Sequence, residues 1–381
     1  MKLDDVFDAQ FRERLAKPAG DGGTCLPNPC YTSREWLEIE NERLFARTWV
    51  FAGCIDQIPE PGDVLPLTIA GKPIMLVHGR DGEIRAFHNV CRHRGALVVD
   101  EPCHGKAVLT CPYHAWTYGL DGRLKNRPPF HGADRHDRPG NGGGPGLVPI
   151  RISRWYRFFF VNLDGRAQEF EDFIAPLARR LPHHDLNALR LGKTLVWEFR
   201  ANWKIVFENY FDNYHVGTIH PRLDAFLPMT QRRPFEPDGP LLQFEALFDE
   251  PEAGRGVGLP HYPGVPKELA HFEAGYHLFP SVCFQIWPDQ LTVFQVFPVA
   301  HNHTVEHLHI FFVGQGASEP AYEEARQSVY DMWDELNQED INAIEWMQSG
   351  RMSPAFDGGR LSGYWDPSLQ HFARLTVDLM S

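Results

Sequence analysis

Two closely spaced pairs of cysteine and histidine lie in the first third of the chain. Cys91 and His93 form the first pair, and Cys111 and His114 form the second. Two thiolates and two imidazoles suit either a tetrahedral zinc ion or a two-iron, two-sulfur cluster with mixed ligands. Structural zinc sites usually pair Cys with Cys and His with His, whereas a Rieske cluster takes one Cys and one His from each of two loops. The sequence has the second arrangement and therefore predicts a Rieske [2Fe-2S] cluster.

A second group of potential metal ligands lies about a hundred residues further on. Asp212 and His215 are three positions apart, so they would share one face of a helix. His220 would point elsewhere on an unbroken helix, but Gly217 and Pro221 predict that the helix loosens and lets both imidazoles reach one ion. Two His and one carboxylate, with neighbouring coordination positions open, form the facial triad of Fe(II) oxygenases. Because the chain has 19 histidines, a chance cluster is the alternative.

Short strand-like runs surround the two Cys-His pairs. Between about residues 45 and 155, runs rich in β-branched and aromatic residues alternate with Gly, Pro and Asp turns, which predicts a small antiparallel β domain. Both pairs fall at strand ends or hairpin loops, so two loop tips can converge on one metal group. Residues 131–146 are polar and glycine-rich, and we expect a surface loop there.

Residues 1–44 and 156–381 are assigned to a second, larger domain with the iron site. Helices are predicted at about 168–182, 203–217 and 320–350, with strand-like runs between the last two. A sheet flanked by helices without βαβ alternation predicts an α+β fold. The chain has no Gly-x-Gly-x-x-Gly motif, so we expect it to bind no dinucleotide or flavin itself.

Composition narrows the class of protein further. The formal net charge of −13 argues against nonspecific binding to nucleic acid or to anionic membranes. No apolar run approaches the roughly 20 residues that span a bilayer, and the acidic N-terminus lacks a signal-peptide core, so we expect a cytoplasmic protein. The odd count of seven cysteines favours metal ligation over disulfides, and a further metal pair at Cys25 and Cys30 stays open.

The stretch from Cys91 to Leu124, CRHRGALVVDEPCHGKAVLTCPYHAWTYGLDGRL, resembles the Rieske signature of non-heme iron ring-hydroxylating oxygenase α subunits. Cys103 and His104 match no ligand of that family, and we interpret them as packing or surface residues. Residues 202–221, NWKIVFENYFDNYHVGTIHP, resemble the iron motif of the same family. The motif is matched by Asn209, Asp212, His215 and His220. One departure is Glu208, which stands where the family often has Asn, and this leaves the role of Asn209 open.

The resemblance also implies the third iron ligand. Residues 338–348 resemble the Glu-Asp-x-x-x-x-Glu-x-x-Gln segment of the family, in which the Asp binds iron, so Asp340 inherits that role. From the residues alone, Asp340 is one of six acidic candidates in the last long helix. The others, most of which we expect on a solvated face, are Asp331, Asp334, Glu335, Glu339 and Glu345.

For Asp212 the resemblance implies a bridge rather than a ligand. In the family this Asp connects an iron-bound His with a Rieske His of a neighbouring subunit, which here would be His215 and His114. A carboxylate between two imidazoles fixes their tautomers and gives a short electronic path. The bridge implies a ring-shaped oligomer, usually a homotrimer, in some cases with added β subunits.

The implied reaction is reductive activation of O2. Electrons come from NAD(P)H through a separate reductase or ferredoxin, reach the Rieske cluster, and pass through Asp212 to a mononuclear Fe(II). The last long helix and the tail at 371–374 look nearer to the choline, carnitine and betaine oxygenases than to naphthalene dioxygenases, although the tail departs from the usual Phe-His-x-Trp ending. We therefore expect N- or O-dealkylation or hydroxylation of an amine or quaternary ammonium compound, with aromatic ring mono- or dihydroxylation as the alternative.

Aromatic residues crowd the predicted catalytic region, where they could line a pocket for a ring, cage a quaternary ammonium group, or form ordinary core. They are Phe207, Tyr210, Phe211, Tyr276, Phe279, Phe284, Trp287, Phe294 and Phe297. Two other classes of protein remain as rivals. A zinc hydrolase would use His215, His220 and Asp340 to activate water, and a pure electron carrier would have no iron there.

Overall fold

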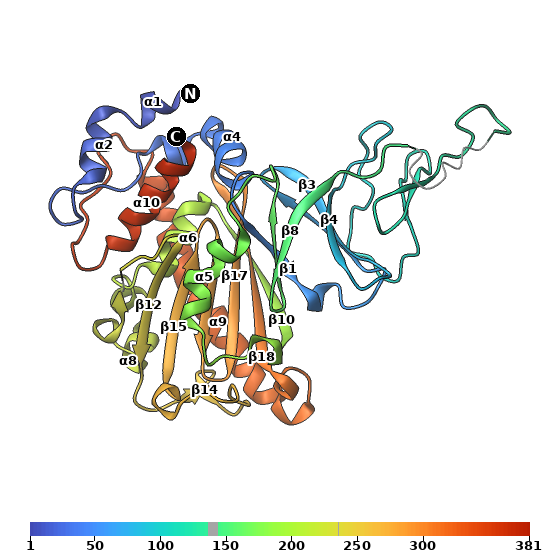
Figure 1. Ribbon diagram of the computed structural model, residues 1–381. Coiled ribbons are helices and arrows are strands. Elements are labelled where there is room, and N and C mark those ends of the chain that lie inside the picture. The colour runs from blue at the N-terminus through green and yellow to red at the C-terminus, as the bar shows by residue number, and fades with distance from the viewer. Residues whose placement is uncertain (136–143, 235) are drawn as a thin grey trace. The chain divides into compact units, whose positions relative to one another are not determined.

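A computed structural model describes residues 1–135, 144–234 and 236–381 of the chain. The chain divides into two compact units, one formed by Phe45–Phe170 and the other by Met1–Leu44 together with Glu171–Ser381 (Figure 1). Of the surface loop predicted at 131–146, residues 136–143 lie outside the described part. None of the described helices is long and apolar enough to cross a membrane.

The unit Phe45–Phe170 is built from two antiparallel sheets. A six-stranded sheet has the order β1-β9-β8-β4-β3-β2, and a three-stranded sheet has the order β5-β6-β7. The strands are β1 (Val50–Cys54), β2 (Val64–Ile69), β3 (Lys72–His78), β4 (Ile84–His88), β5 (Leu109–Thr110), β6 (Thr117–Tyr118), β7 (Leu124–Asn126), β8 (Pro149–Trp155) and β9 (Phe158–Asn162).

The other unit is organised around a seven-stranded antiparallel sheet with the order β10-β18-β17-β16-β15-β12-β11. A separate two-stranded ribbon, β13-β14, is parallel. The strands are β10 (Leu189–Phe199), β11 (Arg233–Pro234), β12 (Leu241–Leu247), β13 (Glu252–Ala253), β14 (Gly256–Val257), β15 (Phe272–Leu278), β16 (Val282–Trp287), β17 (Gln290–Ala300) and β18 (His303–Val313).

Helices accompany this large sheet, and α6 and α9 both contact its strands. The helices are α1 (Leu3–Val6), α2 (Ala9–Ala16), α3 (Pro29–Thr32), α4 (Arg34–Glu40), α5 (Phe170–Arg180), α6 (Trp203–Phe211), α7 (Val216–Ile219), α8 (Pro221–Phe226), α9 (Glu323–Gly350) and α10 (Pro367–Met380). Small antiparallel sheets in one unit and a large antiparallel sheet with helices in the other confirm the predicted α+β fold.

Helix α9 has a continuous buried stripe that packs toward the sheet. Residues Val329, Trp333 and Leu336 of α9 share one hydrophobic cluster with Phe294 of β17 and Ile310 of β18. The three- and four-residue spacing of the stripe is the pattern of an amphipathic helix. This packing fixes which side chains of α9 face the interior of the unit.

Candidate metal centres

The two Cys-His loops are built in the same way. Cys91 N–H donates to Ala96 O, and Cys111 N–H donates to Trp116 O, each at 2.8 Å. Each loop turns through a residue with positive φ, which is glycine at position 95 (φ 78°) and Ala115 (φ 54°). Glycine takes this left-handed conformation without the strain that a Cβ brings. The two turns therefore present their ligand side chains in equivalent ways.

The four side chains of these loops form a thiol pair and an imidazole pair. Cys91 and Cys111 are buried, whereas His93 is exposed and His114 is half-buried. The two imidazole rings lie 4.6 Å apart between centroids. Burial raises the pKa of the Cys111 thiol, and the neighbouring Cys91 thiol adds to the increase.

The spread of the ligand atoms of these four residues argues against a single zinc ion at the two loops. A tetrahedral zinc brings its four ligand atoms within about 4 Å of one another. Among the described residues, the one group of at least three His, Cys, Asp or Glu ligands whose atoms all lie within 4.8 Å is His215, His220 and Asp340. Two thiols at one end and two imidazoles at the other fit a two-iron cluster instead.

Two aromatic residues of the second loop contact these groups, and the sequence analysis did not single them out. The Trp116 ring stacks on His93 with centroids 4.9 Å apart and an interplanar angle of 5°. The Tyr118 hydroxyl lies 3.4 Å from Cys91 Sγ and accepts a 2.9 Å hydrogen bond from Arg92 N–H. Toward a thiolate ligand, which only accepts, the hydroxyl donates.

Cys103, His104 and Cys25, which the sequence left without an assigned metal, each contact other parts of the protein. Cys103 pairs by its backbone with Val64, and His104 Nδ1 lies 3.1 Å from a carboxylate oxygen of Asp63. Cys25 is buried and donates its thiol to Gly358 O. Burial raises the pKa of Cys25 above its ordinary value, so the neutral thiol is favoured.

The segment with the proposed iron ligands breaks earlier than the sequence analysis predicted. Helix α6 ends at Phe211, and Asp212 has extended backbone. Asp212 and His215 therefore do not share a helix face, and that prediction was wrong. The side chain of Asp212 accepts a 2.7 Å hydrogen bond from Tyr214 N–H. This local turn competes with the helix for the backbone donor and ends it, as Asp side chains often do.

Two short helices then place the second histidine. Helix α7 ends at Ile219, and α8 begins with Pro221 at its first position. Proline is favoured there because it lacks the N–H that a helix start leaves unpaired. His220 lies between the two helices and is 4 % exposed. The break predicted from Pro221 is present, and it turns His220 toward α9.

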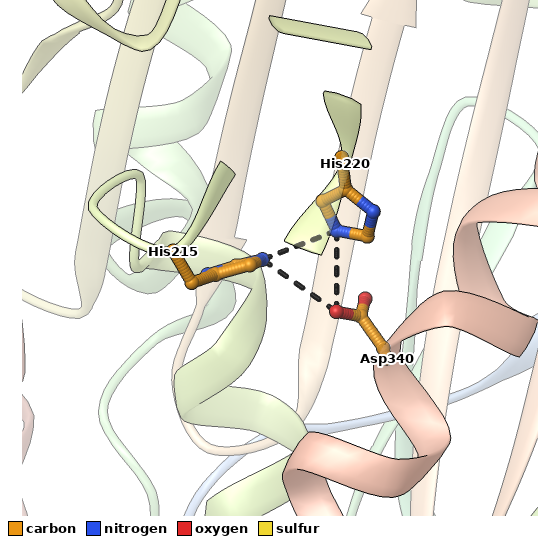
Figure 2. A group of neighbouring side chains, drawn as sticks. All are labelled: His215, His220 and Asp340. Carbon is orange, nitrogen blue, oxygen red and sulfur yellow. Dashed lines mark hydrogen bonds and ion pairs between the residues drawn. The ribbon is translucent and has the colours of Figure 1, made fainter. Parts of the chain in front are cut away.

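The structure brings His215, His220 and Asp340 together (Figure 2). The two Nε2 atoms lie 3.2 Å apart. Asp340 Oδ1 lies 3.6 Å from His215 Nε2 and 3.2 Å from His220 Nε2. Among the described residues no group donates a hydrogen bond to this buried oxygen. An orphaned carboxylate oxygen facing two imidazole nitrogens fits a divalent cation with two His and one Asp ligand.

A further carboxylate faces the outer nitrogen of each histidine. Asp212 Oδ2 lies 3.4 Å from His215 Nδ1, and Glu339 Oε2 lies 2.7 Å from His220 Nδ1. The contact with His220 is a hydrogen bond, whereas Asp212 and His215 form an ion-pair contact. A carboxylate at Nδ1 favours the proton there and leaves Nε2 free to bind a metal. Asp212 was expected beside His215 from the family resemblance. Glu339 is one of the acidic residues of α9, most of which were expected on a solvated face, and it instead contacts His220.

The electrostatics around the three residues favour a cation. Burial lowers the pKa of His220, but the carboxylates of Asp340 and Glu339 raise it more, so it lies above its ordinary value. Burial raises the pKa of Asp212, but its contacts with His215 and with the N–H groups of Tyr214 and His215 bring it below its ordinary value. Carboxylates therefore surround the imidazoles and stabilise positive charge there.

Other acidic and amide groups of α9 hold the start of α6 in place. Gln348 Oε1 accepts a 2.7 Å hydrogen bond from Asn202 N–H, at the N-cap of α6. Glu345 binds the guanidinium of Arg200 through both carboxylate oxygens. The helix with Asp340 and the helix that precedes His215 are thus connected at two points.

A cavity opens beside the three proposed iron ligands. Its lining includes five aromatic side chains: Tyr210, Phe244, Trp287, Phe294 and Trp333. Tyr210, Trp287 and Phe294 are among the aromatic residues considered from sequence, whereas Phe244 and Trp333 were missed. Phe207, Phe211 and Phe279 instead pack around Phe372 of α10.

The fold and the two ligand groups define a Rieske-type non-heme iron oxygenase. The sequence pattern of the Rieske [2Fe-2S] domain matches residues 48–136. The pattern of the catalytic domain of ring hydroxylating alpha subunits matches residues 186–381, just over half of the chain. The chain therefore belongs to the family of ring-hydroxylating oxygenase α subunits. The predicted cofactors, a Rieske cluster and a mononuclear iron, are those of this family, and an enzyme of this class takes its electrons from a separate reductase.

Two curated relatives are oxygenase subunits of monooxygenases. The carnitine monooxygenase oxygenase subunit of Acinetobacter baumannii is 29 % identical over 373 residues, 92 % of this chain and 94 % of the relative. The glycine betaine monooxygenase oxygenase subunit of Pseudomonas aeruginosa is 37 % identical over 205 residues, 53 % of this chain and 46 % of the relative.

Among solved structures, a quaternary ammonium Rieske monooxygenase in complex with L-carnitine is 26 % identical, with a TM-score of 0.79 over 97 % of this chain and 98 % of that one. Naphthalene 1,2-dioxygenase shares the fold, with a TM-score of 0.73 at 20 % identity. The predictions of a Rieske oxygenase and of its relation to the carnitine and betaine branch are confirmed.

Proposed function

We propose that this chain oxidises a quaternary ammonium compound at a carbon bonded to the nitrogen. The observation that carries the proposal is the aromatic lining of the cavity beside His215, His220 and Asp340. The rings of Tyr210 and Phe294 lie 4.5 Å apart, and those of Phe294 and Trp333 lie 5.1 Å apart. Aromatic faces attract a cation that has no hydrogen-bond donors of its own. The similarity to carnitine and glycine betaine monooxygenase subunits supports the same class of substrate.

The proposed reaction inserts one oxygen atom of O2 into a C–H bond next to nitrogen. The second oxygen atom leaves as water, with two electrons from the reductase and two protons. The hydroxylated carbon then loses the nitrogen, and an amine, an aldehyde and a proton are released.

The proposal assigns a role to each ligand side chain. Cys91, His93, Cys111 and His114 hold the Rieske cluster, and His215, His220 and Asp340 hold the mononuclear iron. When bound, the two groups supply electron transfer and the binding of O2. Asp212 and Glu339 keep the Nδ1 protons of His215 and His220 in place, so that both Nε2 atoms face Asp340.

Asp212 is the proposed electron bridge to His114 of a neighbouring copy in a homotrimer. Apolar side chains are exposed around both groups, which supports contact between copies. Tyr113, beside His114, is 58 % exposed, and Tyr214, beside Asp212, is also 58 % exposed. Met347 of α9 is 43 % exposed and lines a surface depression together with Asp212 and Tyr214. Added β subunits and a cytoplasmic location are part of the same expectation.

The test is a turnover assay with the protein loaded with both metal groups and a generic reductase. Quaternary ammonium compounds are screened for NADH-dependent O2 uptake, and products are identified by mass spectrometry. We expect an amine and an aldehyde in equal amounts. His215→Ala should abolish both products and keep the visible spectrum of the cluster, because His215 lies in the unit without the Cys-His loops.

Aromatic ring hydroxylation is the second candidate, favoured by the large subunit of anthranilate 1,2-dioxygenase from Acinetobacter baylyi, 33 % identical over 209 residues. That relative matches 52 % of this chain and 43 % of its own length. A product that gains two oxygen atoms without release of an amine would establish ring dioxygenation and overturn the first proposal.

A further inference from the structure

A buried ion pair forms part of the wall of the cavity that contains the proposed iron ligands. Arg232 and Glu273 both line this cavity, and the side chain of each is 2 % exposed. Arg232 Nη1 donates to Glu273 Oε1 at 2.9 Å. Gln285, which also lines the cavity, donates to the same oxygen at 2.6 Å. One side of the Arg232 guanidinium is therefore held in a fixed position by the protein.

The other edge of the guanidinium has no partner in the described chain. Arg232 Nε and Nη2 are buried and donate no hydrogen bond to any described residue. The face of the guanidinium lies near the Phe244 ring, with Cζ 5.4 Å from the ring centroid. Leaving buried donors of a charged group unpaired is costly, so such donors normally have a bound partner such as an anion or a water molecule.

The shape of the free edge indicates which ligand completes it. The Nε and Nη2 donors of arginine point in parallel and match the two oxygens of one carboxylate. An aromatic hydrocarbon or a simple alcohol offers no such pair of acceptors. Either would leave the Nε and Nη2 donors of Arg232 unpaired.

We propose that the substrate carries a carboxylate, which the Nε–Nη2 edge of Arg232 binds in the cavity beside the proposed iron ligands. This inference rests on the proposed function and makes it more specific, because it restricts the quaternary ammonium substrates to zwitterions. Arg232 is then a specificity-determining residue.

The charges around Arg232 favour a zwitterion over a plain anion. Glu273 Oε2 is also buried without a described hydrogen-bond partner, so the lining of this cavity includes an unpaired carboxylate oxygen as well as the free guanidinium edge. This oxygen repels an isolated anion and attracts a cation. A molecule with a carboxylate and a quaternary ammonium group pairs with Arg232, and its cationic end is stabilised by Glu273 and by the rings of Tyr210 and Trp287.

The first test compares matched ligands on the enzyme loaded with both metal groups. Isothermal titration calorimetry measures the dissociation constants of trimethylammonium carboxylates of increasing chain length. Each is paired with the alcohol that replaces its carboxylate, as choline does for glycine betaine. For the chain length that binds best, we expect the alcohol to bind roughly 100-fold more weakly or worse. Equal affinities for the carboxylate and the alcohol would overturn the proposal.

Two variants then test whether the preference for a carboxylate over an alcohol depends on Arg232. Arg232→Lys keeps the charge and loses the parallel donors, so carboxylate affinity should fall by about 10-fold or more while the alcohol is little affected. The double variant Arg232→Gln/Glu273→Gln leaves no buried charge behind and should abolish the difference between carboxylate and alcohol. A preference that survives in the double variant contradicts the assignment.

Arg179→Lys is the matched control, because Arg179 forms an exposed ion pair with Asp238 away from the cavity lining. Iron content and circular dichroism check that the variants fold. If the variants do not fold, the comparison of carboxylates with alcohols on the wild-type enzyme decides whether the cavity prefers a carboxylate.

Failure of this inference differs from failure of the proposed function. If binding depends on the carboxylate and on Arg232 but no amine and aldehyde form, the proposed reaction is wrong and the carboxylate site stands. If choline and glycine betaine are cleaved alike in wild type and Arg232→Lys, the reaction stands and the carboxylate site is wrong. Benzoate provides a third comparison: tight binding of benzoate with no gain from the ammonium group would show that the site takes any carboxylate.

Discussion

The Nδ1 atom of each proposed iron-binding histidine faces a carboxylate, Asp212 for His215 and Glu339 for His220. The two carboxylates differ in their surroundings, because Asp212 is 40 % exposed and Glu339 is 26 % exposed at the side chain. Glu339 has the shorter contact and lies beside the proposed ligand Asp340 in α9. It is therefore the residue that fixes the orientation of His220.

We expect Glu339→Gln to weaken iron binding by roughly 10- to 100-fold, because the outer partner of His220 loses its charge. Iron retained after dialysis against a weak chelator measures the effect. Glu335→Gln is the control on the same helix, since Glu335 pairs with Arg222 and not with a histidine. Equal iron loss in both variants would show that Glu339 has no orienting role.

At the Rieske loops, we expect Tyr118→Phe to make the reduction potential of the cluster more negative. The Tyr118 hydroxyl lies 3.4 Å from Cys91 Sγ, and a hydrogen bond to a ligand sulfur stabilises the reduced, more negative cluster. A redox titration followed by electron paramagnetic resonance measures the shift. Tyr113→Phe removes a hydroxyl from the same loop that contacts Arg94 instead, and its potential should be unchanged.

The site residues that could be predicted from the sequence are those that lie a few positions apart along the chain. The Cys-His pairs and His215 with His220 are recognisable because few residues separate them. Asp340 needed the family resemblance, although one signal was present: it is in helical register with Trp333, Leu336 and Ile344, which are buried. Arg232 and Glu273 could not be predicted, because they are 41 residues apart and meet only through the fold, Arg232 just before β11 and Glu273 in β15.

At the scale of elements, the break after α6 determines the geometry around the proposed iron ligands. The predicted helix at 203–217 is correct up to Phe211. The turn formed by the Asp212 side chain then replaces helical hydrogen bonds. A sequence pattern of apolar spacing continues through this point, so periodicity alone could not locate the end of the helix. Strand β10 was not predicted from the sequence, and it is buried only at its two ends and partly or fully exposed between them.

The turn between β16 and β17 has a buried acid that makes stability depend on pH. Burial raises the pKa of Asp289 to about 7 from 3.8. Between these values the folded chain holds a proton that the unfolded chain has lost, so the free energy of unfolding falls as pH rises from about 4 to about 7. Above that range no further loss occurs.

Asp289→Asn should remove this dependence. We expect the variant to gain up to a few kcal/mol over wild type as pH rises from about 4 to about 7, and to gain nothing more above it. Denaturant unfolding at a series of pH values measures the difference. Asp331→Asn, at an exposed position of α9, is the control. Curves for Asp289→Asn and wild type that run parallel would contradict the assignment.

At the scale of the whole molecule, Asp212 should decide whether electrons reach the iron. We expect Asp212→Asn to reduce turnover by roughly 100-fold or more, because a neutral amide fixes the His215 tautomer poorly and weakens the bridge. The reductase should still reduce the cluster at the wild-type rate, and turnover is expressed per bound iron, because Asp212 also contacts the proposed iron ligand His215. Stopped-flow absorbance of the cluster separates the two steps, and slow cluster reduction in the variant would place the defect elsewhere.

The two metal groups differ in how much of the chain they need. The proposed cluster ligands all lie between Cys91 and His114, inside one compact unit, whereas the proposed iron ligands run from His215 to Asp340 in α9. During synthesis the N-terminal part of a chain folds first, so the four cluster ligands can be in place before α9 exists. Iron must wait until α9 packs on the sheet. The order of the residues therefore allows the electron-accepting group to be assembled first, whereas the site for the group that reacts with oxygen is complete only when α9 has packed.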